Sequence, residues 1–115
     1  MKKNKKYNVQ FRIWFFVNGE KLLGKGRVEL LERIQDTGSI TNAAKCMNMS
    51  YRQAWQMVSE MNKYSERPLV EKKLGGKNGG GAILTEAGRN AIVIFKKLDA
   101  KIATFISEEI KKVNL

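Results

Sequence analysis

The sequence predicts an α+β fold, a winged helix-turn-helix, from the order of patterns across residues 38–85. A short helical pattern that starts at Ser39 leads through a tight turn at Asn48 into a second helical pattern at Ser50. A short apolar strand and the glycine-rich loop 75–81 follow, before a return strand. In this architecture the second helix is shaped to enter the major groove of DNA.

Length and composition set the frame for that fold. A chain of 115 residues, 43% hydrophobic and 29% charged, is long enough for one domain with its own core, so we expect residues 1–115 to form a single unit. No apolar run approaches the roughly 20 residues that cross a bilayer. The lysine-rich start leads into alternating rather than continuous apolar residues, unlike a secretory signal. We therefore expect a cytoplasmic protein with no membrane partner.

The charge balance favours a polyanionic partner. Lys and Arg number 22 against 11 Asp and Glu, a net charge of +11, and neutralising phosphates releases condensed counterions. A basic surface that is merely solvated is the alternative. The chain has no histidine, which excludes histidine-based acid–base catalysis and histidine metal ligands. We expect no enzyme and no cofactor, and Cys46 is interpreted as a buried, reduced, small apolar residue.

The N-terminal part, residues 7–23, has the pattern of a β-hairpin. Apolar residues alternate with others from residue 9 to 17, which is the period of a strand, and Asn18-Gly19 is a strong signal for a two-residue turn. Trp14 and Phe16 make the second face apolar too. Both faces of the hairpin are expected to be covered, with a partner subunit as one candidate.

Three helical patterns fill residues 27–65. The first ends at Gly38, a left-handed stop, and Ser39 is placed to accept from the free amides of the next helix. Small residues in that helix permit a close helix crossing. The expected inward residues are Leu30, Leu31 and Ile34 in the first helix and Ile40, Ala43, Ala44 and Met47 in the second.

The third helix is the candidate recognition helix. Ser50 and Gln53 have the spacing of a capping box, which starts the helix sharply. A helical wheel separates a packing side from a free side that could read DNA. The packing side is predicted to hold Tyr51, Ala54, Trp55, Val58 and Met61, and the free side Arg52, Gln56, Ser59 and Lys63.

Side chains on this helix suit base contacts. Arg52 can donate two parallel bonds to guanine O6 and N7, and Gln53 or Gln56 can match adenine N6 and N7; Gln53 is alternatively held by its cap. The Tyr51 ring is assigned to the packing side, although its hydroxyl near the helix start could reach a phosphate. An amphipathic core helix with solvated polar residues is the alternative. The predicted DNA contacts are Thr41, Ser50, Tyr51, Arg52, Gln53, Gln56, Lys63, Lys77 and Asn78.

Pro68 forbids continuation of the third helix, and residues 69–84 are predicted to form the wing, with Lys77 near a sugar–phosphate edge or the minor groove.

A long helix over 85–113 follows, roughly 40 Å at about 1.5 Å per residue. Its distal apolar stripe exceeds what so small a core can cover, so a second copy of the chain is expected. The predicted dimer contacts are Leu98, Ile102, Phe105, Ile106 and Ile110.

Motifs along nearly the whole chain resemble the DNA-binding domain of ModE-type regulators, the molybdate-responsive bacterial transcription factors. The helix, wing and capping residues are similar to LysR-type regulators as well. The residues that carry the resemblance are Gly26-Arg27, Leu30-Leu31, Gly38-Ser39-Ile40, Ala43-Ala44, Ser50-Tyr51-Arg52, Ala54-Trp55, Glu60-Met61-Asn62, Pro68-Leu69-Val70-Glu71, Gly75-Gly76-Lys77, Gly79-Gly80-Gly81, Leu84-Thr85 and Gly88.

The resemblance implies a winged-helix dimer that binds a palindromic operator in double-stranded DNA and controls transcription, often of molybdate uptake or molybdenum-cofactor genes. In that family molybdate binds a separate C-terminal domain, and this chain is expected to lack it. The implied protein is a DNA reader that works with a separate effector protein or is regulated by abundance. An RNA-binding module and a protein-interaction adaptor on the same scaffold are the alternative functions.

Overall fold

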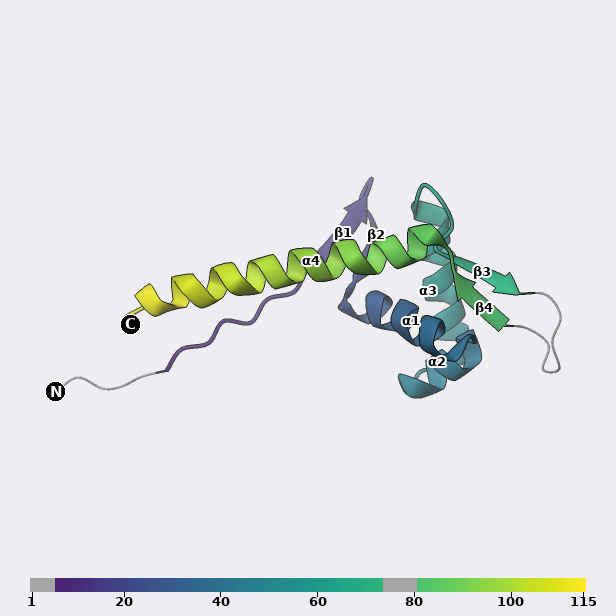
Figure 1. Cartoon of the computed structure of the whole chain (residues 1–115), viewed down its shortest axis with the longest axis horizontal. Helices are drawn as coiled ribbons and strands as arrows, with labels where there is room; N and C mark the ends of the chain where they lie inside the picture. The colour runs from purple at the N-terminus through teal and green to yellow at the C-terminus, as the bar shows by residue number, and fades with distance from the viewer. Residues whose placement is uncertain (1–5, 74–80) are drawn as a thin grey trace.

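The computed structural model describes residues 6–73 and 81–115. A compact group of helices and strands sits at one end of a long helix, whose other end carries the C-terminus (Figure 1). The predicted order of hairpin, three helices, wing and long helix is confirmed. The elements are β1 (Trp14–Val17), β2 (Glu20–Gly24), α1 (Lys25–Thr37), α2 (Ile40–Cys46), α3 (Tyr51–Tyr64), β3 (Val70–Lys73), β4 (Gly81–Leu84), α4 (Glu86–Glu109) and the 3₁₀ turn η1 (Ile110–Lys112).

The hairpin turns where the sequence predicts it. Asn18 and Gly19 have φ of 50° and 83°, as a type I′ turn requires, and β1 pairs antiparallel with β2 around a bulge after Phe15. The predicted start of the strand at residue 9 is wrong, because β1 begins at Trp14. β2 ends opposite Trp14 and the chain turns into α1, so the residues before β1 have no strand beside them and instead run along α4 (Figure 1).

The core forms where α1, α2 and α3 meet the wing and the first half of α4. Leu30, Leu31 and Ile34 of α1 and Met61 of α3 are fully buried. Ala43 and Ala44 of α2 are at most 1% exposed, and their small size lets α2 lie close to its neighbours. The predicted inward positions are confirmed, with Met47 half-buried at the margin.

Local signals fix the helix ends around the helix-turn-helix. Gly38 has φ of 70° and its amide donates to the Ile34 carbonyl over 2.8 Å. Ser39 Oγ accepts from the Asn42 amide at 3.1 Å, which starts α2. Asn48 has φ of 54° in the turn between α2 and α3. This turn sets the angle between α2 and α3.

The wing and α4 share one junction. Val70 pairs with Leu84 at the body end of the β3–β4 ladder, and Thr85 Oγ1 accepts from the Gly88 amide at 3.0 Å to start α4. α4 is 24 residues long, about 36 Å at 1.5 Å per residue. Its buried residues fall in its first half, up to Phe95. The second half therefore extends beyond the core, as predicted.

Candidate nucleic-acid interface

A narrow apolar stripe holds α3 on the body. Ala54 and Met61 have no exposed surface and Val58 is 6% exposed; these residues recur at the i, i+4, i+7 spacing of one helix face. Ser50 Oγ accepts from the Gln53 amide at 3.1 Å, so the Ser50 half of the predicted capping box is confirmed. The opposite face of α3 is left to solvent.

Arg27 orients α3 from beneath. Its guanidinium donates to Glu60 Oε1 over 2.7 Å and to the Lys21 carbonyl over 2.8 Å, and the residue is 9% exposed. This joins β2, α1 and α3 through one charged group. The sequence of α3 contains one acidic residue, Glu60. Its carboxylate forms an ion pair with Arg27. The one carboxylate of α3 is therefore paired, which lowers its repulsion of a phosphate.

Asn62 fixes the wing beside α3. Its Oδ1 accepts from the Leu69 and Val70 amides at 2.8 and 3.2 Å, and its Nδ2 donates to the Val70 carbonyl at 3.0 Å. The side chain therefore hydrogen-bonds the backbone where β3 begins, as a neighbouring strand would. Recognition helix and wing are thus held in one geometry, which preorganises a two-part surface.

The predicted DNA contacts that fall in the described residues are all exposed, on α3, at its start or at the start of α2. Neither Lys77 nor Asn78 can be placed, since both lie outside the described residues. The Gln53 side chain is exposed, so it is available for a base. The exposed predicted contacts are Thr41, Ser50, Tyr51, Arg52, Gln53, Gln56 and Lys63.

The predicted packing roles of Tyr51 and Trp55 are wrong. Tyr51 is 48% exposed and Trp55 is 43% exposed. The buried stripe is centred on Ala54, and Trp55 follows it by about 100° around the helix, so its large ring lies beside the stripe rather than within it. Lys72 of β3 places its Nζ 5.5 Å from the centre of the Trp55 ring. A helical wheel groups Tyr51 and Trp55 with the packing side, but they lie at its edge, and only Ala54, Val58 and Met61 are buried. The sequence does not indicate the contact of Trp55 with Lys72, because the two residues are remote in sequence.

Cys46 is also exposed rather than buried. It lies in the last turn of α2, about 200° around the helix from Ala44, and therefore points away from the core. Small size and apolar neighbours in sequence favoured burial, whereas the angular position alone indicates the exposed face.

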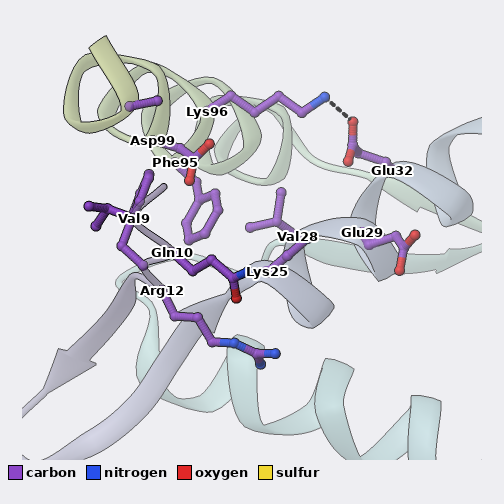
Figure 2. A pocket seen from close by; sticks show the side chains of 12 residues that line it. Val9, Gln10, Arg12, Lys25, Val28, Glu29, Glu32, Phe95, Lys96 and Asp99 are labelled. Atoms are coloured by element: carbon purple, nitrogen blue, oxygen red, sulfur yellow. Dashed lines mark ion pairs between the residues drawn. The ribbon is translucent and has the colours of Figure 1, made fainter. Parts of the chain in front are cut away.

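A separate groove of about 790 Å³ lies between the N-terminal segment, α1 and α4. Figure 2 shows Val9 and Gln10 beside Phe95 and Asp99 of α4, with Lys96 paired to Glu32 of α1. The lining combines apolar side chains with charges of both signs. Within residues 6–73 and 81–115, no cluster of three His, Cys, Asp or Glu side chains suits a metal ion. The groove is the seam along which the N-terminal segment packs, and its lining includes no residue of α3.

Helices in the described part of the chain are too short or too polar to span a membrane.

The chain is similar to a molybdenum-pterin-binding protein and to transcriptional regulators of known name. It is 42% identical over 93 residues to the molybdenum-pterin-binding protein MopB of Rhodobacter capsulatus, covering 81% of this chain and 34% of that protein. It is 47% identical over 73 residues to the transcriptional regulator ModE of Haemophilus influenzae, covering 64% and 29%. The DNA-binding transcriptional dual regulator ModE of Escherichia coli K12 is 46% identical over 72 residues, covering 63% and 28%.

These alignments confirm the resemblance to ModE-type regulators, and the chain spans about a third of the length of these relatives. Residues 26–89 match the model of the bacterial regulatory helix-turn-helix proteins of the lysR family. The matched range runs from the second residue of α1 to the first turn of α4 and so takes in α2, α3 and the wing. The chain belongs to the lysR family of bacterial regulatory helix-turn-helix proteins.

Proposed function

We propose that this chain is a sequence-specific DNA-binding transcription regulator of ModE type, tied to molybdate and acting in the cytoplasm on double-stranded DNA. The observation that carries the proposal is the outer face of α3. It presents Arg52, Gln53 and Gln56 to solvent, while Arg27 and Asn62 fix the helix to the body and the wing. Similarity to ModE regulators, and to relatives named as a molybdenum-pterin-binding protein and a molybdenum transport protein, supports the link to molybdate.

Base recognition is assigned to the start of α3. Arg52 suits guanine and Gln56 suits adenine, because each can form two parallel hydrogen bonds to those bases in the major groove. Lys63 lies farther along the helix and is exposed, where it suits a phosphate. The net charge of +11 supplies the long-range attraction to DNA.

A homodimer through α4 is part of the proposal. Leu98 and Phe105 are 37% and 65% exposed, whereas Ile102, Ile106 and Ile110 are half-buried. The radius of gyration is 18.1 Å, compared with about 13 Å for a compact chain of this length. A second copy packed on the exposed stripe would bury it. A two-fold pair would also place two α3 helices on a palindromic site.

Enrichment of a random duplex library with the purified protein tests DNA recognition. The enriched duplex should bind saturably, and six phosphate contacts would lower its affinity about a thousandfold between 50 and 200 mM salt. Arg52→Ala should reduce binding to this duplex by roughly 1–3 kcal/mol and flatten sequence preference. Equal losses on enriched and scrambled duplexes would contradict the role of Arg52, and no saturable binding to any duplex would overturn the proposed function.

Two further measurements test the link to molybdate genes and the homodimer. Pull-down of fragmented genomic DNA should enrich sites near molybdate-transport or molybdenum-cofactor genes, and enrichment of unrelated genes only would remove the link to molybdate. Sedimentation at micromolar concentration should give a dimer, and Phe105→Glu should shift it to monomer without loss of helix content. A wild-type monomer would contradict the assignment of α4.

A further inference from the structure

The junction between α3 and the wing carries a pair of residues that the base-reading face does not use. Trp55 is 43% exposed on α3 and Lys72 is exposed on β3, with the Lys72 Nζ 5.5 Å from the centre of the indole ring. Asn62 holds β3 against α3 at this place. The pair is therefore fixed in position between the two parts that would meet DNA.

The pleat of the wing directs Lys72 toward α3. Side chains alternate between the two faces of a strand, so Lys72 shares its face with Val70, and its ladder partner Ala82 lies on that face too. Val70 and Ala82 are 4% and 2% exposed, which shows that this face packs on the body. Glu71 lies on the opposite face, so the junction presents a cation without a neighbouring carboxylate from β3.

Trp55 does not belong to the core or to the base-reading positions. It lies between the buried Ala54, about 100° away around the helix, and the base-reading Arg52, about 60° away, and so borders both sets. An indole has a large apolar surface and one N–H donor. This combination suits a deoxyribose ring with its phosphate better than a base edge, because a base edge is read by paired donors and acceptors.

We propose that Trp55 and Lys72 clamp the sugar–phosphate strand that separates the groove occupied by α3 from the groove beside the wing. Lys72 pairs with a phosphate, and the indole packs on the adjoining sugar and donates its N–H to a phosphate oxygen. The contact positions the protein on DNA and carries no sequence preference. This inference rests on the proposed function and deepens it by assigning a second DNA contact outside the base-reading set.

Salt-dependent binding of two variants tests the clamp. Lys72→Ala should weaken binding to enriched and scrambled duplexes alike, by about fivefold at 0.15 M salt, and reduce the slope of log K against log salt by about 1. Trp55→Ala should weaken both duplexes severalfold and leave the slope unchanged, because the indole is neutral. Trp55→Phe keeps the ring and should retain most of the affinity. Unfolding midpoints of the variants establish that each is folded.

A matched control exists on the hairpin. Lys21 lies 4.0 Å from the centre of the Trp14 ring, so Lys21→Ala removes the same charge and the same type of contact away from the junction. It should change the salt slope much less than Lys72→Ala. Since the chain has two tryptophans, Trp14→Phe leaves Trp55 as the single tryptophan, whose emission can be excited selectively over that of the tyrosines. Its fluorescence should change on saturation with duplex.

The outcomes separate the clamp from the proposed function. If the wild-type protein binds DNA and both Trp55→Ala and Lys72→Ala bind with the same affinity, the clamp alone is overturned. Unchanged Trp55 emission at saturation would overturn it too. A loss confined to the enriched duplex would show base reading and also overturn it. Absence of binding by the wild-type protein to any duplex would overturn both proposals.

Discussion

Replacing Asn62 with Ala is predicted to destabilise the fold more than a surface asparagine would. The Asn62 amide makes three hydrogen bonds at the start of β3, accepting from the amides of Val70 and of Leu69 just before the strand and donating to the Val70 carbonyl. Leu69 and Val70 are each 4% exposed. Solvent therefore cannot easily replace the lost partner, and their backbone groups would be left unsatisfied.

The magnitude follows from those orphaned groups. Each buried donor or acceptor left without a partner costs about 1–3 kcal/mol, and losses within one network are not additive. We expect Asn62→Ala to lower the free energy of unfolding by about 2–4 kcal/mol. Asn62→Asp keeps oxygen acceptors for the two amides but loses the donor to the Val70 carbonyl. Its loss should be smaller.

Urea denaturation followed by circular dichroism measures these differences. Asn90 is exposed on α4 and provides a matched control, so Asn90→Ala should stay within about 0.5 kcal/mol of the wild type. The midpoint should fall for Asn62→Ala with the slope unchanged. A loss below about 0.5 kcal/mol would refute the reasoning that Asn62 substitutes for a strand partner.

Three other substitutions test the packing, each by the same denaturation measurement. Leu30→Ala removes a fully buried side chain and should cost about 2–5 kcal/mol; a loss under 1 kcal/mol would contradict its burial. Gly88→Ala places a methyl group against the Leu69 carbonyl oxygen, so it should destabilise by about 1–3 kcal/mol although alanine favours helix, and a gain in stability would be the opposite of this expectation. Arg27→Met removes the pair with Glu60 and should cost about 1–3 kcal/mol, whereas wild-type stability would show that the pair is dispensable.

Local signals were sufficient to predict where most elements begin and end. Asn18-Gly19 needs positive φ at both residues, and Gly38 ends α1 in the left-handed region. Ser50 and Thr85 satisfy amides within their own helices. Each signal acts over a few residues, so the sequence alone carries it.

Contacts between distant segments were not predictable in the same way. Arg27 and Glu60 are 33 residues apart, and their pairing depends on how α1 crosses α3. The alternation before Trp14 resembled a strand, but strand formation requires a partner, and β2 ends opposite Trp14. A helical wheel puts Trp55 on the packing side, whereas the buried stripe is as narrow as Ala54, Val58 and Met61 and leaves the indole 43% exposed at its edge.

Amide chemical shifts of the ¹⁵N-labelled protein, recorded as the enriched duplex is added, test most directly whether the outer face of α3 meets DNA. The largest shifts should fall on residues 50–63 and on β3, with small shifts in the N-terminal segment. Large shifts confined to the hairpin and the second half of α4, with α3 unchanged at saturation, would contradict the account.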